Sequence, residues 1–108
     1  MNIPNKAIIP EEKLTRYLLV PRLKDDKSKY LAQAGFTPDN PNDLLTAIRQ
    51  LITHNTAVKE NVNEYGTFYT VEGKLQGINN LNLAVVTVWL QSKHDGSFRF
   101  ITLKPKKS

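Results

Sequence analysis

Residues 81–90 form the most uniform apolar run of the chain and limit what it can fold into. The run reads Leu-Asn-Leu-Ala-Val-Val-Thr-Val-Trp-Leu. A run of this length could be a buried strand or a short buried helix. Because β-branched residues in succession lose χ1 freedom in a helix and suit a pleated sheet, we expect a central strand around which the other apolar segments pack.

The first half of the chain has the pattern of three helices. Pro10 followed by two glutamates predicts the first helix, with Pro10 as its first residue. Asp25 or Asp26 can cap the second helix, and the third begins at Pro41 with Asn40 as its N-cap. The third helix has one apolar face, made by Leu44, Leu45, Ile48, Leu51 and Ile52.

The second half has the pattern of strands and short turns. Residues 57–64 read as a loop that leads into a short edge strand, and apolar and polar residues alternate from Thr67. Asp95-Gly96 is a tight-hairpin dipeptide, which places a last strand at residues 98–103. Helices in series followed by strands in series predict an α+β fold, in which about three N-terminal helices pack on a C-terminal antiparallel sheet of about four strands.

The length and composition set further expectations. A chain of 108 residues suits one domain, which we place at residues 8–105, with flexible ends at 1–7 and 106–108. No run is long enough to cross a bilayer and the N-terminus has no signal-peptide pattern. Cysteine is absent, which excludes thiol chemistry. We therefore expect a cytoplasmic protein with no membrane partner.

The formal charge of +5 is spread unevenly along the chain. Residues 1–30 and 67–108 are basic, whereas residues 31–66 are acidic. If the two basic ends meet, they form a surface that attracts a polyanion such as RNA, or an acidic partner protein. The alternative is that the charge only keeps a small domain soluble.

Short strings spread over residues 8–105 resemble a small bacterial domain family, notably cyanobacterial, that is classed as a domain of unknown function. The strings include Ile9-Pro10, Asp26-Lys27-Ser28-Lys29, Tyr65-Gly66, Val86-Thr87-Val88-Trp89 and Arg99-Phe100-Ile101-Thr102. The family is similar in layout to the barnase, EndoU, colicin and RelE superfamily of ribonuclease toxins. The resemblance implies helices before a four-stranded sheet and a toxin-like domain that cleaves RNA without a metal ion.

The resemblance also implies a set of site residues. RNA cleavage needs a base, an acid and a cation that holds the phosphate charge. The implied catalytic residues are Lys27, Tyr69, Thr87 and Arg99, and the implied substrate-binding residues are Arg22, Lys24, Lys29 and Thr102. Many toxin members carry a histidine where this chain has Arg22-Leu23-Lys24, so the base would be an unusual lysine or one of the two histidines of the chain.

Each implied residue also has a structural reading. Trp89 reads as a core aromatic, and Tyr69 fits a strand position as well as a functional one. Side chains alternate between the two faces of a strand. We therefore expect Thr102 on the same face of the last strand as Phe98 and Phe100, and Arg99 on the opposite face, unless a bulge intervenes.

The two histidines, His54 and His94, have no second ligand at metal-binding spacing, so we expect no metal and no cofactor. Two functions remain open. One is a ribonuclease-toxin-like domain, and the other is a non-catalytic protein that binds a partner, such as one component of a toxin–antitoxin pair. The expected partners are RNA and a cognate antitoxin or immunity protein, and the oligomeric state is not predicted.

Overall fold

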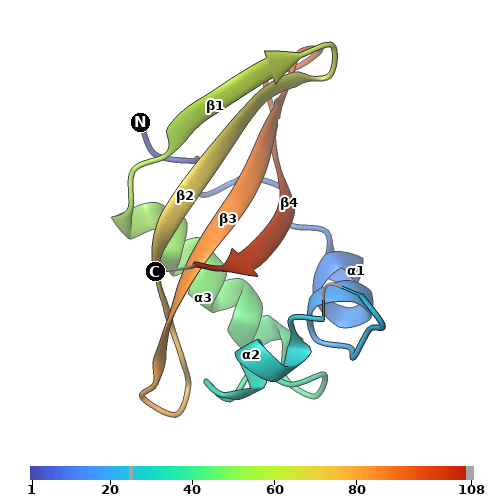
Figure 1. The fold of residues 1–108 in the computed structure, drawn as a ribbon. Helices are drawn as coiled ribbons and strands as arrows, with labels where there is room; N and C mark the ends of the chain where they lie inside the picture. The colour runs from blue at the N-terminus through green and yellow to red at the C-terminus, as the bar shows by residue number, and fades with distance from the viewer. Residues whose placement is uncertain (25, 107–108) are drawn as a thin grey trace.

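The expected order of helices followed by strands is confirmed. The structure is a computed structural model that describes residues 1–24 and 26–106. The helical segments are α1 (Glu11–Lys13), the π-helical turn η1 (Leu14–Leu18), α2 (Ser28–Ala32) and α3 (Pro41–His54). The strands are β1 (Val58–Asn63), β2 (Gly66–Gln76), β3 (Asn82–Ser92) and β4 (Phe98–Pro105), and they form one antiparallel sheet in the order β1-β2-β3-β4 (Figure 1).

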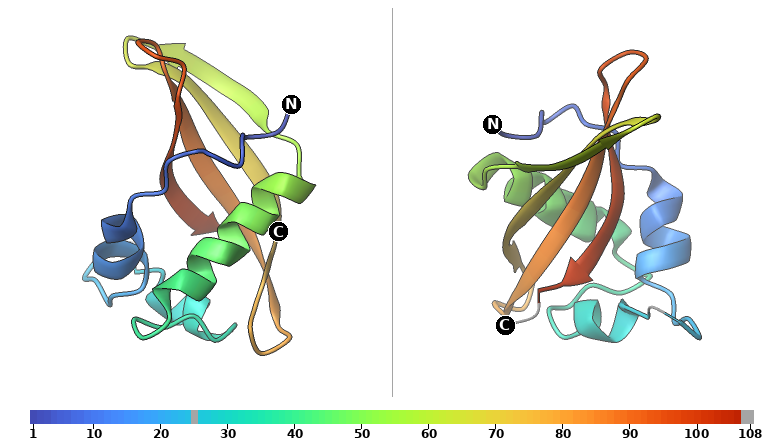
Figure 2. Two further views of the ribbon diagram at one scale, coloured as in Figure 1. Left: turned by 180° about the vertical axis from the view of Figure 1, so that it is seen from behind. Right: turned by 45° about the horizontal axis from the view of Figure 1, so that its top comes forward.

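The apolar run at residues 81–90 forms most of β3, which pairs with both β2 and β4. Its side chains at Val85, Thr87 and Trp89 are fully buried. Helix α3 lies across this face of the sheet (Figure 2) and contributes the buried side chains of Leu44, Ala47, Ile48, Leu51 and Ile52. The amphipathic pattern of α3 and the strand pattern of β3 therefore meet in one core.

The opposite face of the sheet is not covered by a helix in the described part of the chain (Figure 1). Val86, Val88 and Leu90 of β3 lie on this face, between the core-facing residues of the strand, and each is half-buried. We call it the open face. No helix in residues 1–24 or 26–106 is long and apolar enough to cross a membrane.

Two helix starts differ from the expected caps. Pro10 precedes α1 in an extended conformation and is not its first residue. Pro41 does begin α3, but Asn40 makes no side-chain cap. Its Oδ1 instead accepts a hydrogen bond of 2.7 Å from the backbone N–H of Thr37, because asparagine bonds its own local backbone readily.

The start of α2 is held by an acidic side chain from outside the helix. Asp26 Oδ1 accepts hydrogen bonds from the Ser28 backbone N–H at 2.9 Å and from Ser28 Oγ at 2.6 Å. Lys27 directly precedes the first residue of α2. The alternative cap, Asp25, lies outside the described residues.

The first residues of the chain pack against the domain, although the sequence suggests a flexible end at 1–7. Ile3 and Ala7 are buried, and the Ala57 N–H donates to the carbonyl oxygen of Met1 at 2.7 Å. Ile8 forms a parallel bridge with Arg99, so the N-terminal segment covers the edge of β4. At the other end, Lys106 donates its backbone N–H to the Ala84 carbonyl at 3.0 Å.

Candidate functional site

A β-bulge in β4 decides which of its side chains reach the open face. The pairing with β3 runs Leu90 with Arg99 and Trp89 with Phe100, and then shifts so that Val88 pairs with Thr102. Directly paired residues share a face of the sheet, so Arg99 and Thr102 both lie on the open face. The expectation that Thr102 shares the face of Phe98 and Phe100 is wrong, because the extra residue at the bulge reverses the alternation.

Lys27 and Thr102 meet across the gap between the start of α2 and β4. The Lys27 ammonium group donates a hydrogen bond of 3.0 Å to Thr102 Oγ1. Both side chains are half-buried, because one lies on an edge strand and the other lies in the segment that leads into α2. This contact brings a cation and a hydroxyl group together at the β4 end of the open face.

The ring of Tyr17 lies beside the same lysine and contacts two further cations. The Arg22 guanidinium is 4.2 Å from the ring centroid, the Lys27 ammonium 5.3 Å and the Lys13 ammonium 5.8 Å. A cation within about 6 Å of an aromatic ring is attracted by the negative charge of its face. Tyr17 therefore joins the Lys27–Thr102 pair to Arg22. We call these four residues, Tyr17, Arg22, Lys27 and Thr102, the Lys27 cluster.

The other basic residues of the predicted site lie around this cluster. Lys24 is exposed, and its carbonyl oxygen accepts a hydrogen bond of 3.4 Å from Arg22 Nε. Lys29 is exposed on α2. Arg99 is exposed on the open face, three residues along β4 from Thr102, a separation of about 10 Å in an extended strand. The structure thus brings Lys27, Thr102 and Arg22 together and leaves Arg99 at a distance.

Two of the predicted catalytic residues lie on the core face. Thr87 is 0% exposed; its hydroxyl donates to the Val71 carbonyl at 3.1 Å and accepts from Trp89 Nε1 at 2.8 Å. Tyr69 packs against Phe98, with ring centroids 5.6 Å apart. Both side chains therefore lie on the opposite face of the sheet from Thr102 and Arg99.

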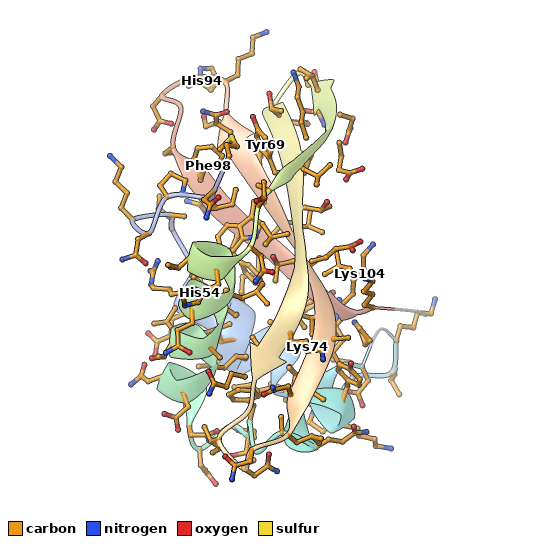
Figure 3. All side chains as sticks on the ribbon, turned by 90° about the vertical axis from the view of Figure 1, so that its left-hand side faces the viewer. His54, Tyr69, Lys74, His94, Phe98 and Lys104 are labelled. Atoms are coloured by element: carbon orange, nitrogen blue, oxygen red, sulfur yellow. The ribbon has the colours of Figure 1, made fainter. Side chains whose placement is uncertain are left out.

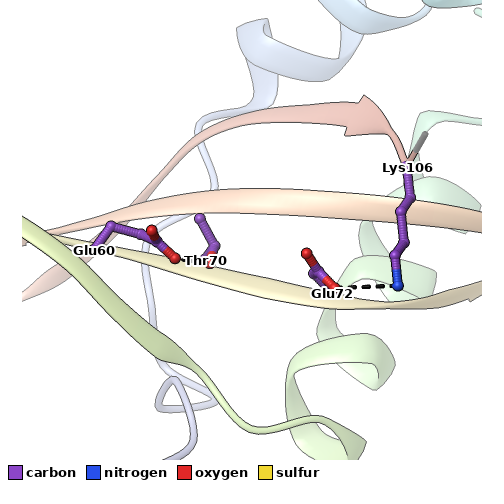
Figure 4. Close-up of polar contacts among 4 residues, drawn as sticks. All are labelled: Glu60, Thr70, Glu72 and Lys106. Carbon is purple, nitrogen blue, oxygen red and sulfur yellow. Dashed lines mark hydrogen bonds and ion pairs between the residues drawn. The ribbon is translucent and has the colours of Figure 1, made fainter. Parts of the chain in front are cut away.

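The acidic side chains of the open face lie on the side of β1 and β2. Glu72 pairs with Lys106 at 3.2 Å, and Glu60 accepts a hydrogen bond of 2.8 Å from Thr70 (Figure 4). The β4 side carries exposed cations, and Figure 3 shows Lys104 on the side of the sheet away from α3. Lys74 of β2 is also exposed on this face, so its cations lie on both the β2 side and the β4 side, with Arg99 and Lys104 on the strand next to the Lys27 cluster.

The histidines do not form a site together. His54 ends α3 and His94 lies in the turn between β3 and β4, well apart in Figure 3. Within residues 1–24 and 26–106, no three side chains of the histidine, cysteine, aspartate and glutamate types are grouped as a metal site.

Asp26 fixes the position of the lysine that follows it. Hydrogen bonds from the side chain and backbone of Ser28, with a smaller electrostatic contribution from Lys29, hold the pKa of the Asp26 carboxyl group below its usual range. The carboxylate is therefore charged at neutral pH, when its two bonds to Ser28 anchor the segment from which Lys27 reaches Thr102.

Tyr17 was not among the site residues predicted from the sequence. Leu14 and Leu18 of the same helical segment are buried, whereas Tyr17 is only half-buried. The available signal was Lys13, four residues before Tyr17 and so on the same side of a helix. The contacts of Arg22 and Lys27 with Tyr17 arise from tertiary structure, and no local pattern predicts them.

The arrangement of the cluster suits an anion. Lysine and arginine can donate several hydrogen bonds to phosphate oxygens, and Thr102 adds a hydroxyl group beside them. Lys27 and Thr102 are half-buried, which strengthens their interactions relative to open water, whereas Arg22 is exposed.

Comparisons with known proteins agree with the fold. A family model described as "Domain of unknown function (DUF6883)" matches residues 2–107. A solved structure described as a contact-dependent growth inhibition toxin and immunity protein complex from Klebsiella pneumoniae 342 contains a similar chain. The TM-score is 0.69 at 21% identity, covering 95% of this chain and 96% of that chain. At this identity the likeness shows the fold alone. No curated protein matches the sequence.

Proposed function

The chain belongs to the DUF6883 family, and on this premise we propose that it is a toxin-like domain that binds RNA at the Lys27 cluster and cleaves it without a metal ion. The observation that carries the proposal is the hydrogen bond of 3.0 Å between Lys27 and Thr102 at the edge of the open face. The fold shared with a chain of a toxin and immunity protein complex supports the toxin-like part.

The binding part rests on charge and access. Lys27 and Arg22 offer donors to a backbone phosphate, and Arg99 and Lys104 extend the positive charge along β4. The open face gives a strand of RNA room to lie across the sheet, whereas α3 closes the other face. Single-stranded RNA is the class of ligand that fits such a surface best, because its backbone and bases are both accessible.

The chemical part is a transesterification. The 2′-oxygen attacks the adjacent phosphorus and the bond to the 5′-oxygen breaks, which leaves a 2′,3′-cyclic phosphate and a 5′-hydroxyl group. A base accepts the 2′-hydroxyl proton and an acid donates one to the 5′-oxygen. Arginine does not transfer protons at neutral pH, so Arg22 stabilises charge on the phosphate, and Lys27 and Tyr17 are the members of the cluster that carry transferable protons.

The test uses a fluorescently labelled single-stranded RNA with the protein in EDTA. We expect cleavage products that end in a 2′,3′-cyclic phosphate, and we expect the Lys27→Ala variant to lose the activity with its melting temperature nearly unchanged. Lys93→Ala is the matched control, because Lys93 has the same charge and is exposed in the turn between β3 and β4, outside the predicted site. Full activity of Lys27→Ala, or equal losses in both variants, would contradict the assignment.

A second function becomes the better candidate if the wild-type protein binds RNA but does not cleave it, or if it does not bind RNA at all. The similar chain occurs in a complex of a toxin with an immunity protein, so the second candidate is a non-catalytic protein that binds a cognate partner. Expression of the wild-type chain in a bacterium without a partner distinguishes the two. Arrested growth that depends on Lys27 supports the toxin, whereas normal growth together with intact RNA supports the partner-binding protein.

A further inference from the structure

Three cations from three segments of the chain converge on one aromatic ring. Lys13 is in α1, Arg22 lies in the segment after η1, and Lys27 precedes α2. Their charged groups lie 4.2–5.8 Å from the centroid of the Tyr17 ring. Like charges brought this close repel one another, and the negative faces of an aromatic ring offset part of that repulsion.

The ring is held in place by the backbone around it. The Leu19 N–H donates to the Leu14 carbonyl at 3.0 Å, which closes a π-helical turn around Tyr17. Turns of this kind are rare and are frequent at functional sites. Leu14 and Leu18 on the same turn are buried in the core and anchor it. Tyr17 is left half-buried beside the Lys27–Thr102 contact.

We infer that Tyr17 is a positioning residue, whose ring holds Arg22 and Lys27 together so that both bind one RNA phosphate. The inference rests on the proposed function and adds the residue that organises its site. The guanidinium carbon of Arg22 lies 4.2 Å from the centroid of the ring, a distance that allows the two planar groups to stack. Stacking orients the planar fork of an arginine, which a lysine cannot reproduce.

For RNA binding, the inference makes the ring of Tyr17 necessary and its hydroxyl group dispensable. Phenylalanine keeps the aromatic face, so Tyr17→Phe retains both cation contacts. Leucine keeps an apolar side chain of moderate size but has no aromatic ring, so Tyr17→Leu releases Arg22 and Lys27. Arg22→Lys keeps the charge and removes the stacked plane, and it is safe for folding because Arg22 is exposed.

The experiment measures binding of a fluorescently labelled single-stranded RNA over a range of salt concentrations. We expect Tyr17→Phe to bind within about twofold of wild type and Tyr17→Leu to bind roughly tenfold more weakly. The slope of log affinity against log salt should also fall in magnitude by about 0.7 in Tyr17→Leu, as for one lost phosphate contact to a single strand. A protein that only lost stability would keep the wild-type slope once folded.

Two control variants separate this role from general effects. Tyr65→Leu changes an exposed tyrosine in the turn between β1 and β2, and Arg16→Lys changes an exposed arginine on η1. Neither should alter affinity or slope, whereas Arg22→Lys should weaken binding severalfold with its charge intact.

The outcomes are distinguishable. RNA binding by wild type with unchanged affinity and slope in Tyr17→Leu overturns the inference and leaves the proposed function standing. An equal loss in Tyr17→Phe and Tyr17→Leu assigns the effect to the hydroxyl group and also overturns it. If Tyr17→Leu does not fold, Arg22→Lys decides, since wild-type binding by that variant contradicts positioning by stacking. Absence of RNA binding by wild type removes the proposed function and the inference together.

Discussion

Lys27 donates a hydrogen bond of 3.0 Å to Thr102 across 75 residues of sequence. The contact joins the segment before α2 to the edge strand of the sheet, and the bulge in β4 makes it part of the open face. A hydrogen bond to a charged donor stabilises more than a neutral one, but partial exposure reduces its contribution.

The strength of this contact can be measured by a double-mutant cycle. We expect the variants Lys27→Met and Thr102→Val to show a coupling free energy of unfolding of about 1 kcal/mol. Urea denaturation at constant m value gives the four free energies that the cycle needs. A coupling indistinguishable from zero would mean that the two side chains do not interact in solution.

We expect Thr87 to contribute to the stability of the fold and not to RNA binding or cleavage. Replacing it with valine keeps the shape and removes the partner of Trp89 Nε1, which then lies buried without an acceptor. We expect Thr87→Val to lower the free energy of unfolding by about 1–3 kcal/mol. RNA affinity of the folded variant should equal that of wild type, and a selective loss of RNA binding or cleavage would return Thr87 to the site.

The Asp26 carboxylate gives a pH-dependent contribution to stability. Its pKa in the folded protein lies below the ordinary aspartate value of 3.8, mainly because of hydrogen bonds from the Ser28 side chain and backbone. A group whose pKa is lowered by folding stabilises the protein above its unfolded pKa, and this stabilisation is lost as the pH falls through the folded value. Wild type should therefore melt at a higher temperature than Asp26→Asn at neutral pH.

The difference in melting temperature between wild type and Asp26→Asn should shrink as the pH falls below 3.8. Thermal melts followed by circular dichroism from neutral to acidic pH measure it. A difference that stays constant over this range would show that the charge of Asp26 does not contribute.

The fold was predictable where one local pattern dominated. The β-branched run of β3 and the amphipathic face of α3 each specify their element, and both predictions are confirmed. The face of the sheet on which Thr102 lies was not predictable, because the bulge depends on how β4 pairs with β3. Side chains alternate between the two faces of a strand only where its pairing register is regular.

The candidate site was predictable in part. Lys27, Arg22 and Thr102 were named from the resemblance, and the structure places them around one ring and one hydrogen bond. The role of Tyr17 in the cluster was missed because the residues that it contacts come from separate segments of the chain. Thr87 fitted an active-site motif by residue type, but its core-facing register with Val71 explains its hydroxyl contacts instead.

RNA bound at the Lys27 cluster would contact Lys27 through a phosphate, so the salt dependence of its affinity should change when that charge is removed. The measurement is the affinity for one labelled single-stranded RNA at several salt concentrations, for wild type, Lys27→Gln and the control Lys93→Gln. We expect affinity to fall steeply with salt in wild type. The slope of log affinity against log salt should be smaller in magnitude by about 0.7 in Lys27→Gln and nearly unchanged in Lys93→Gln. Absence of binding by wild type at about 50 mM salt, or equal slopes in all three proteins, would contradict the account.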